Sequence, residues 1–397
     1  MHAITISNLV NQDFLKIIPG WVTILIVLLF MSISYYFLFL QSSIILRILV
    51  PISLIGIFLV IGFGLFKYDI SINLSIFLIS FPVTFAGSIS YLTFAEGAEK
   101  KKYSKVLSNM VDPTIVKEAL TDLDTLKKGG EKEITAFFSD VASFSTISEQ
   151  LNSTDLASLL NEYLSAMTII LKHNMGTLDK YIGDAVVGIF GAPIDRKEHY
   201  LEAARASLEM LQKLEELKAF WTKNNMYIKD AQNMNIRIGL NTGLAKVGFM
   251  GTDSLASYTM MGDTVNLAAR LEAAGKDYGV NILISQMTKT KVEAEMFTKK
   301  MDAVVVKGKT EPVLIYELIG KNGEVPKHLV EATELYEEAF QLHLNRSWEK
   351  AIQKFQESIK AKGKKDKAAS MLIERCEFYI TNPPPENWNG SFVRTHK

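Results

Sequence analysis

The sequence of 397 residues contains one cysteine, Cys376, and no excess of charge of either sign. A single cysteine cannot form an internal disulfide bond and cannot supply a cysteine-built metal site. The six histidines are scattered and lack the spacing typical of zinc ligands. The 43 basic and 43 acidic residues cancel, so the composition gives no reason to expect nucleic acid as a partner.

Hydrophobic residues are concentrated in residues 21–95, after an N-terminal tail of residues 1–20. This stretch holds three apolar runs, at about 21–40, 44–66 and 70–95, each close to the roughly 20 residues that a helix needs to cross a bilayer. A signal peptide would have a shorter apolar run and a small-residue cleavage site. We therefore expect three transmembrane helices. A buried soluble bundle is the alternative, and these runs would leave it little polar surface.

Charge predicts the orientation of these helices. Lys100, Lys101 and Lys102 directly follow the third run, and positive charge marks the cytoplasmic side of a membrane protein. The soluble part is therefore expected in the cytoplasm, attached to the plasma (inner) membrane by a multi-pass anchor. Residues 96–130 carry a helical pattern that Pro113 interrupts, so two short helices are expected in this linker.

From 131 to 320, strand-like and helix-like patterns alternate. The order indicates an α+β fold with helices packed on one face of a sheet, and the ferredoxin-like split βαβ arrangement is the leading candidate. The expected strands are 134–139, 177–182, 185–190, 236–241, 280–285, 303–307 and 312–318, with a hairpin-like stretch reaching 261. The expected helices are 148–173, 197–222, 264–274 and 286–294.

Residues 321–397 are expected to form a helical tail that ends at the Asn-Pro-Pro-Pro sequence beginning at Asn382. The spacing from Ala351 to Phe355 resembles a tetratricopeptide unit, although one repeat cannot bury its own face. A helical hairpin that caps the preceding domain is the alternative.

Two aspartates follow strand-like runs, Asp140 in Phe-Phe-Ser-Asp and Asp184 in Lys-Tyr-Ile-Gly-Asp. A carboxylate at the end of a buried strand is costly unless a cation or hydrogen bonds compensate it. Such oxygen ligands suit magnesium or manganese with a phosphate substrate, while a turn or helix cap is the alternative role. Small residues follow Asp140, so backbone N–H groups around Phe144 and Ser145 could cradle phosphates; a serine or threonine N-cap is the simpler interpretation.

Residues 258–272 form the most specific block. Asn266 and Arg270 are four apart, so a helix places both on one face. The amide could orient a sugar while the arginine neutralises charge that develops at phosphorus. An exposed helix with Arg270 paired to a glutamate is the alternative for this block alone.

Together with Val-Lys-Gly-Lys at 306–309, these blocks strongly resemble the catalytic domain of class III nucleotide cyclases. The resemblance covers about 131–320, with the motifs in the family's order. It implies that Asp140 and Asp184 hold two Mg²⁺ or Mn²⁺ ions, with the carbonyl of Val141 as a further ligand. One ion would acidify the ribose 3′-hydroxyl for in-line attack on the α-phosphorus, and the other would hold the leaving part of the triphosphate.

The resemblance also implies roles for other residues. Asn266 would position the ribose, Arg270 would stabilise the pentacovalent transition state, and Lys307, or Lys309 in its place, would contact the terminal phosphates. Family active sites form at a head-to-tail dimer interface. Since this chain carries every group itself, a homodimer with two active sites is expected. One copy would supply the aspartates, and the other would supply Lys180, Thr259, Asn266 and Arg270.

Lys180 and Thr259 are expected to read the base. Adenine offers an acceptor at N1, which a lysine can serve, and a donor at its amine, which a hydroxyl can accept. Guanylate-making relatives usually carry glutamate and cysteine there, so ATP is the expected substrate and a guanylate cyclase is the alternative. Many adenylate cyclases have aspartate in place of Thr259; threonine resembles a bicarbonate-responsive subgroup.

The membrane segment resembles the three-helix bundle that follows a CHASE-type sensor in bacterial cyclases, but only about 20 residues precede it. The chain could lack a sensor, or the bundle itself could sense or anchor. A non-catalytic receptor or scaffold is a further alternative, and the presence of all four motif residues, Asp140, Asp184, Asn266 and Arg270, argues against it.

Overall fold

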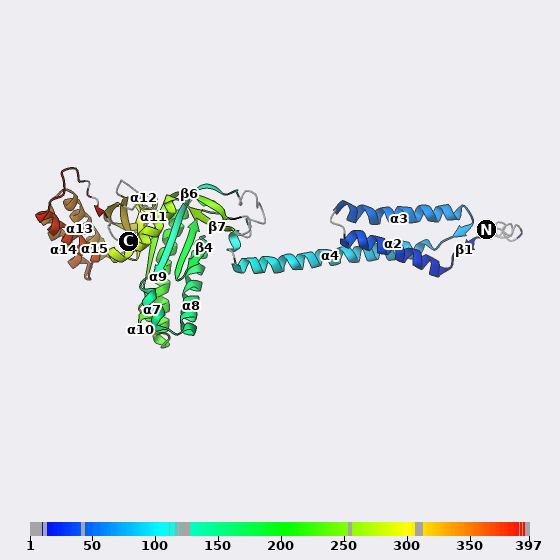
Figure 1. The fold of residues 1–397 in the computed structure, drawn as a ribbon, viewed down its shortest axis with the longest axis horizontal. Helices are drawn as coiled ribbons and strands as arrows, with labels where there is room; N and C mark the ends of the chain where they lie inside the picture. The colour runs from blue at the N-terminus through cyan, green and yellow to red at the C-terminus, as the bar shows by residue number, and fades with distance from the viewer. Residues whose placement is uncertain are drawn as a thin grey trace. The chain divides into compact units, whose positions relative to one another are not determined.

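A computed structural model describes the chain except for residues 1–9, 11–13, 41–43, 111, 116–117, 119–127, 253–255, 306–312, 389, 391 and 394–397. The chain divides into two compact units, Met1–Val106 and Leu107–Lys397. Figure 1 draws both units, and each is described by itself below.

The N-terminal unit contains three long helices, α2 (Gly20–Leu40), α3 (Ile44–Phe66) and α4 (Leu74–Met110). Its core combines aliphatic side chains with three phenylalanines, and the rings of Phe58 and Phe77 stack with their centroids 4.0 Å apart. Large apolar side chains such as Val60 and Phe63 point outward. By length and composition, all three helices could cross a membrane. Two short strands, β1 (Lys16–Ile17) and β2 (Ile70–Ser71), pair in parallel beside them.

The third apolar run and the start of the linker form one helix. α4 continues from the apolar segment through the lysines at 100–102 to Met110, where we had expected a separate short helix. The helix continues across the change from apolar to charged residues, because lysine and glutamate are good helix formers. The second expected linker helix falls mostly outside the described residues.

The C-terminal unit is built on a ferredoxin-like core, as the sequence predicts. Its four central strands are β3 (Gly130–Val141), β4 (Thr177–Ile182), β5 (Ala185–Phe190) and β6 (Ile236–Gly251), which lie side by side in the order β6-β3-β5-β4. All neighbours in this group are antiparallel. The helices α7 (Phe144–Gln150) and α8 (Ser153–His173) connect β3 to β4, and α9 (His199–Lys223) and α10 (Lys229–Gln232) connect β5 to β6.

Further strands extend the sheet on the β6 side. β8 (Ile282–Ser285) pairs with β6 in parallel, and β10 (Val313–Lys321), β9 (Met296–Val305) and β11 (Phe392–Val393) follow outward in that order. β7 (Ala256–Met261) pairs with the far end of β6. α11 (Asp263–Tyr278) and α12 (Gln286–Val292) complete this part.

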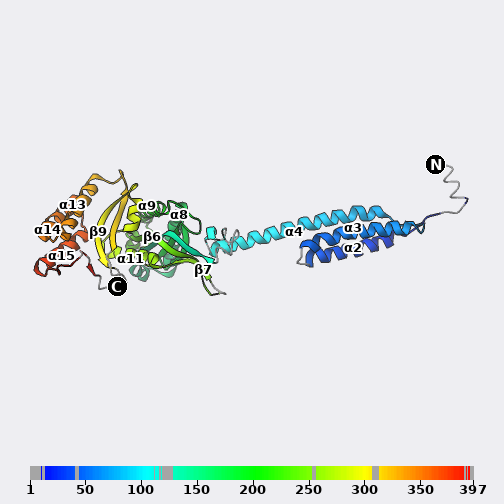
Figure 2. The same cartoon turned by 90° about the horizontal axis from the view of Figure 1, so that it is seen from above.

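Helices cover both faces of the sheet, so the expectation of one covered face was wrong. Phe137 packs in the cluster that holds α8 and α9, whereas its neighbour Ala136 packs with Ala268 of α11 on the opposite face. Figure 2 shows α8 and α9 on one side of the strands and α11 on the other. Gly239 explains the close approach of α11, because a Cβ at this position would lie 2.2 Å from the carbonyl oxygen of Ala268.

The single helix expected at 148–173 is two helices, α7 and α8. Leu151 is extended, and Asn152 caps α8 by accepting from the N–H groups of Thr154 and Asp155. The side-chain oxygen of an asparagine N-cap accepts from backbone N–H groups in the first turn of a helix. Asn152 therefore favours the start of a new helix at this position. The break ends α7 after two turns and sets it beside the end of β3.

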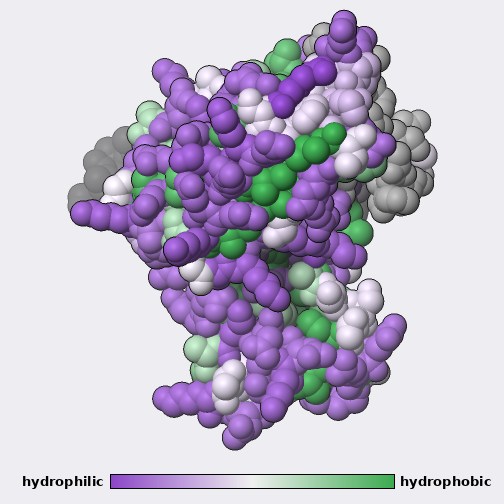
Figure 3. Space-filling model, turned by 90° about the vertical axis from the view of Figure 1, so that its left-hand side faces the viewer, coloured by the Kyte–Doolittle hydropathy of each residue, from purple (hydrophilic) through white to green (hydrophobic). Residues whose placement is uncertain are grey.

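The tail forms three helices, α13 (Lys327–Leu344), α14 (Trp348–Lys362) and α15 (Lys367–Thr381), that pack against α11 and the outer strands of the sheet. Ala351 and Phe355 are fully buried in a cluster shared with Leu283 of β8. This arrangement favours the capping interpretation, and the tetratricopeptide assignment stays a prediction. The face seen in Figure 3, to which the tail contributes, is mostly hydrophilic. The tail is not purely helical, since β11 adds to the sheet beside β9.

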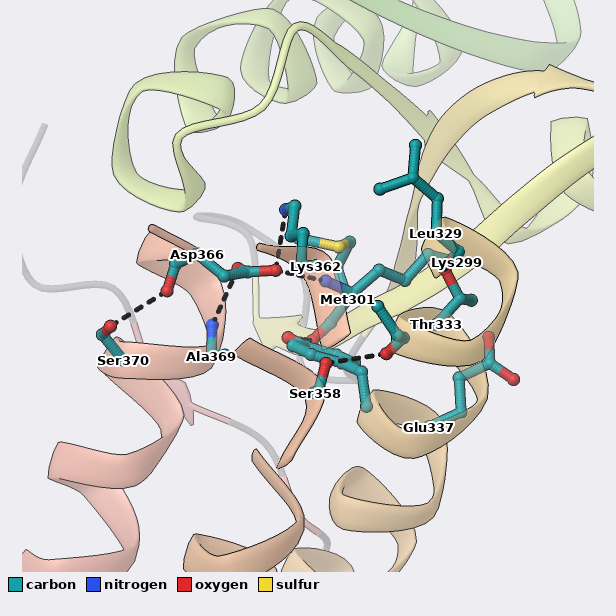
Figure 4. Close-up of polar contacts among 12 residues, drawn as sticks. Lys299, Met301, Leu329, Thr333, Glu337, Ser358, Lys362, Asp366, Ala369 and Ser370 are labelled. Carbon is teal, nitrogen blue, oxygen red and sulfur yellow. Dashed lines mark hydrogen bonds and ion pairs between the residues drawn. The ribbon is translucent and has the colours of Figure 1, made fainter. Parts of the chain in front are cut away.

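A buried ion cluster fastens the tail to the sheet. Asp366 accepts hydrogen bonds from Lys299 of β9 at 2.9 Å and from Lys362 of α14 at 2.7 Å. Its other oxygen caps α15 by accepting from the N–H of Ala369. Figure 4 shows these contacts. One carboxylate therefore ties β9 to two consecutive helices of the tail, α14 and α15.

Candidate active site

A cavity of about 520 Å³ lies where β3 ends and the β4–β5 hairpin turns. It brings together both aspartates that the sequence singles out. Its lining residues are Asp140, Val141, Ala142, Ser143, Phe144, Ser145, Asp184, Asn235, Arg237, Gly275, Lys276, Gly279, Val280 and Asn281. Val141, Phe144 and Ser145, which the sequence also predicts as site residues, are among them.

Local structure places the two carboxylates side by side. Asp184 sits in the tight turn between β4 and β5, where Gly183 has the positive φ of 65° that favours glycine. One oxygen of Asp184 accepts from the N–H of Val141 at 2.9 Å, so the hairpin is tied to the end of β3. Asp140 is the residue immediately before Val141.

Arg237 is a site residue that the sequence interpretation missed. It lies on β6 directly opposite Asp140 of β3. Its Nη2 donates to Asp140 Oδ2 at 2.7 Å, and its Nε donates to Glu272 of α11 at 2.9 Å. A signal was available, because an arginine between two isoleucines interrupts an otherwise apolar strand. One guanidinium thus joins two strands and a helix at the cavity.

The donor set suits a divalent cation. Burial raises the pKa of Asp140, and the carboxylates of Asp184 and Glu272 raise this pKa further against the opposing charge of Arg237. Negative groups held this close favour an added cation. Two carboxylates that line one cavity suit magnesium, which keeps its other positions for water and substrate phosphates. Within the described part of the chain, no group of three or more histidine, cysteine, aspartate or glutamate side chains converges on one point.

The backbone turns sharply between β3 and α7. Ser143 adopts a left-handed conformation with φ of 59°, and its side chain makes no capping hydrogen bond. The chain therefore reverses within a few residues and turns the segment that contains Phe144 and Ser145 toward the two aspartates, where both residues line the cavity.

The other predicted site residues lie outside this cavity. Asn266 and Arg270 are exposed and four residues apart on α11, so they share a face as the sequence predicts. Lys180 is on β4 and Thr259 is on β7. One copy of the chain does not gather these four residues with the two aspartates. Lys307 and the alternative Lys309 lie outside the described residues.

Lys180 and Thr259 share a neighbour that the sequence interpretation did not single out. Thr259 Oγ1 donates to Asp179 Oδ2 at 2.7 Å, and Lys180 Nζ lies 3.4 Å from Asp179 Oδ1. The contact joins β4 to β7. The two residues predicted to read a base are therefore linked through one carboxylate.

Comparison with known proteins gives a consistent result. Residues 126–320 match the family model described as the adenylate and guanylate cyclase catalytic domain. The terminal-differentiation specific adenylate cyclase of Dictyostelium discoideum is 32% identical over 249 residues, which are 62% of this chain and 11% of that protein. Retinal guanylyl cyclase 2 of Rattus norvegicus is 30% identical over 244 residues, 57% of this chain and 21% of that protein.

A solved structure is also similar. The crystal structure of the adenylyl cyclase CyaB from P. aeruginosa is 33% identical, covers 50% of this chain and 98% of that chain, and superposes with a TM-score of 0.45. The chain spans well under half the length of the curated relatives named above. Both adenylate and guanylate cyclases are among the similar proteins.

Proposed function

Because this chain belongs to the adenylate and guanylate cyclase family through residues 126–320, we propose that it converts ATP to 3′,5′-cyclic AMP and pyrophosphate as a membrane-anchored homodimer. The proposal rests on the observation that the predicted site residues of one copy lie in two separate places. Asp140 and Asp184 line one cavity, while Asn266 and Arg270 lie on an exposed helix face outside it. Such a division is what a site shared between two copies requires, since each copy offers half of it.

Metal binding is assigned to the cavity. Asp140, Asp184 and the carbonyl of Val141 would hold Mg²⁺ or Mn²⁺, two ions by the family resemblance. Bound there, such ions supply Lewis-acid activation of a hydroxyl and charge neutralisation at the triphosphate. The hydrogen bond from Val141 N–H to Asp184 fixes this carboxylate beside Asp140. The half-buried, like-charged pair is the feature that fits a divalent cation.

Side chains of the protein contact the phosphates and the ribose. Phe144 and Ser145 border the space for the phosphates, and Arg237 provides a guanidinium at the same cavity wall. From the second copy, Asn266 orients the ribose, and Arg270 places a fixed positive charge where charge develops at the α-phosphorus. Lys307 is proposed as a contact to the terminal phosphates.

The choice of ATP rests on Lys180 and Thr259, which match the acceptor and donor pattern of adenine. GTP is the second candidate substrate, because guanylyl cyclases are among the similar proteins. Changing Lys180 to glutamate and Thr259 to cysteine is expected to move preference toward GTP. Unchanged preference would mean that other residues read the base.

The proposal includes a membrane location. The three apolar helices would span the plasma membrane, and the lysines that follow the third run would keep the catalytic part in the cytoplasm.

A product assay tests the function. The full chain, purified in detergent, is incubated with manganese and either ATP or GTP, with and without bicarbonate, and the products are identified by mass spectrometry. We expect cyclic AMP and pyrophosphate in equal amounts. Cyclic GMP as the main product would replace the substrate assignment, and no cyclic product from either nucleotide would support the non-catalytic alternative.

A further inference from the structure

We infer that Asp179 sets the hydrogen-bond polarity of Thr259 and thereby makes the base pocket select adenine over guanine. The inference rests on the proposed cyclase function and names a specificity-determining residue for it. Asp179 is a positioning residue, because it acts on the base through Thr259 and Lys180.

A β-bulge aims Asp179 toward Thr259. Along the β4–β5 ladder, Leu178 pairs with Gly188 and Lys180 pairs with Val187, so Asp179 is the extra residue on β4. Bulges of this kind redirect a side chain and are common next to active sites. The side chain of Asp179 is only 2% exposed, and one of its oxygens accepts the hydroxyl of Thr259 at 2.7 Å.

The proton count gives the selectivity. A threonine hydroxyl has one proton and two lone pairs, and an ionised carboxylate can only accept. While the Thr259 hydroxyl donates its hydrogen bond to Asp179, its oxygen can only accept a hydrogen bond from a ligand. The exocyclic amine of adenine is a donor and fits this oxygen. The O6 carbonyl of guanine is an acceptor and would face a lone pair of the Thr259 oxygen, with no hydrogen between the two oxygens.

Lys180 completes the pattern. Its ammonium group lies 3.4 Å from the second oxygen of Asp179, and that buried oxygen has no aligned hydrogen bond among the described residues. The ammonium group therefore supports the ionised carboxylate and is itself held near Thr259. Adenine N1 accepts a proton from Lys180, whereas guanine N1 carries a hydrogen and would oppose it.

Burial alone works against an ionised Asp179. It raises the pKa of this carboxyl, and the hydrogen bond from Thr259 and the charge of Lys180 oppose the rise. A buried carboxylate with one poorly satisfied oxygen is costly to the fold. Asp179 lies between the two base-reading residues, so this cost to stability is accepted for the sake of base selection.

The test measures kcat/KM with ATP and with GTP for Asp179→Asn, Thr259→Val and the double variant of the full-length protein. An asparagine amide can donate to Thr259, which frees the hydroxyl proton for guanine O6. We expect the ATP-to-GTP ratio to fall at least about tenfold in each single variant. Because both act through one hydroxyl, the double variant should be no lower than Thr259→Val alone.

Asp195→Asn is the matched control, since Asp195 is 84% exposed and pairs with Lys132 rather than with Lys180 or Thr259; its ratio should not change. An unchanged ratio in Asp179→Asn, or effects that multiply in the double variant, would overturn the inference. If Asp179→Asn does not fold, Thr259→Ser, which keeps the hydroxyl, is compared with Thr259→Val. Equal ratios in those two would also overturn it. A wild-type chain that cyclises neither nucleotide contradicts the proposed function instead.

Discussion

Arg237 and Asp140 face each other across β6 and β3, and the guanidinium donates to the carboxylate at 2.7 Å. The same guanidinium donates to Glu272 on α11, so three elements meet at the wall of the cavity. A carboxylate engaged in this way is held in place before any cation arrives. Since Asp140 is a proposed metal ligand, we expect Arg237 to contact a triphosphate bound with the metal.

Replacing Arg237 tests this role. Arg237→Met is expected to raise the KM for manganese–ATP by about ten- to a hundred-fold, the range of a lost charged hydrogen bond. Arg237→Lys should be affected less, because it keeps the charge and loses the forked geometry. Steady-state kinetics measure both, with melting temperature as the control for folding. An unchanged KM in Arg237→Met would remove Arg237 from the substrate site.

Asp184 is expected to be indispensable for turnover. Asp184→Asn can still accept from the N–H of Val141 but has no charge for a metal, so activity should fall roughly a thousand-fold or more. Asp184→Ala should abolish turnover while the protein stays dimeric in size-exclusion chromatography. Manganese binding, followed by electron paramagnetic resonance, should weaken in both variants. Appreciable activity in either would count against the metal assignment.

The buried cluster around Asp366 is expected to dominate the attachment of the tail. Burial would raise the pKa of Asp366, but Lys299 and Lys362 outweigh it and hold the pKa below its ordinary value. Asp366→Ala leaves two cations without their carboxylate and should destabilise the fold by about 3–5 kcal/mol. Lys299→Met leaves the Asp366–Lys362 pair intact and should cost clearly less. Urea unfolding measures both, and equal losses would contradict the shared-carboxylate account.

His343 should make the tail sensitive to acid. Burial and the nearby Arg375 lower the pKa of His343 to about 4, while an unfolded histidine titrates near 6.5. As pH falls below 6.5 the unfolded chain takes up a proton that the folded chain does not, so stability falls between about pH 6.5 and pH 4. By pH 5 the loss is about 2 kcal/mol.

The matching experiment compares the wild type with His343→Gln, whose side chain does not titrate. The free energy of unfolding is measured at pH 7.5 and pH 5 for both. The variant should lose about 2 kcal/mol less than the wild type over this interval. The same pH dependence in both proteins would show that His343 is not the group responsible.

Several elements were predictable because local signals define them. β4 and β5 begin and end where the sequence places them, since β-rich runs flank a Gly-Asp turn. The pairing of Asp140 with Asp184 followed from motifs, and the structure brings both to one cavity. Their role as metal ligands stays a prediction.

Other features depend on tertiary contacts that a single sequence does not display. The sequence predicts a strand that ends at Asn241 and then a hairpin-like stretch to 261. The structure has the hairpin, but β6 runs without a break to Gly251, because it pairs with β3 and β7 along that length. The face covered by α11 depends on its close approach at Gly239. The roles of Arg237 and Asp179 depend on their partners on other strands, and local sequence patterns do not identify those partners.

The central claim, that each active site is shared between two copies, is tested most directly by mixing two inactive variants. Asp140→Ala and Arg270→Ala are refolded or co-expressed in equal amounts. Half of the dimers would then be mixed, and each mixed dimer has one complete site, so about one quarter of wild-type activity should return. Activity no higher than in the separate variants would contradict the account and place the active site within a single subunit.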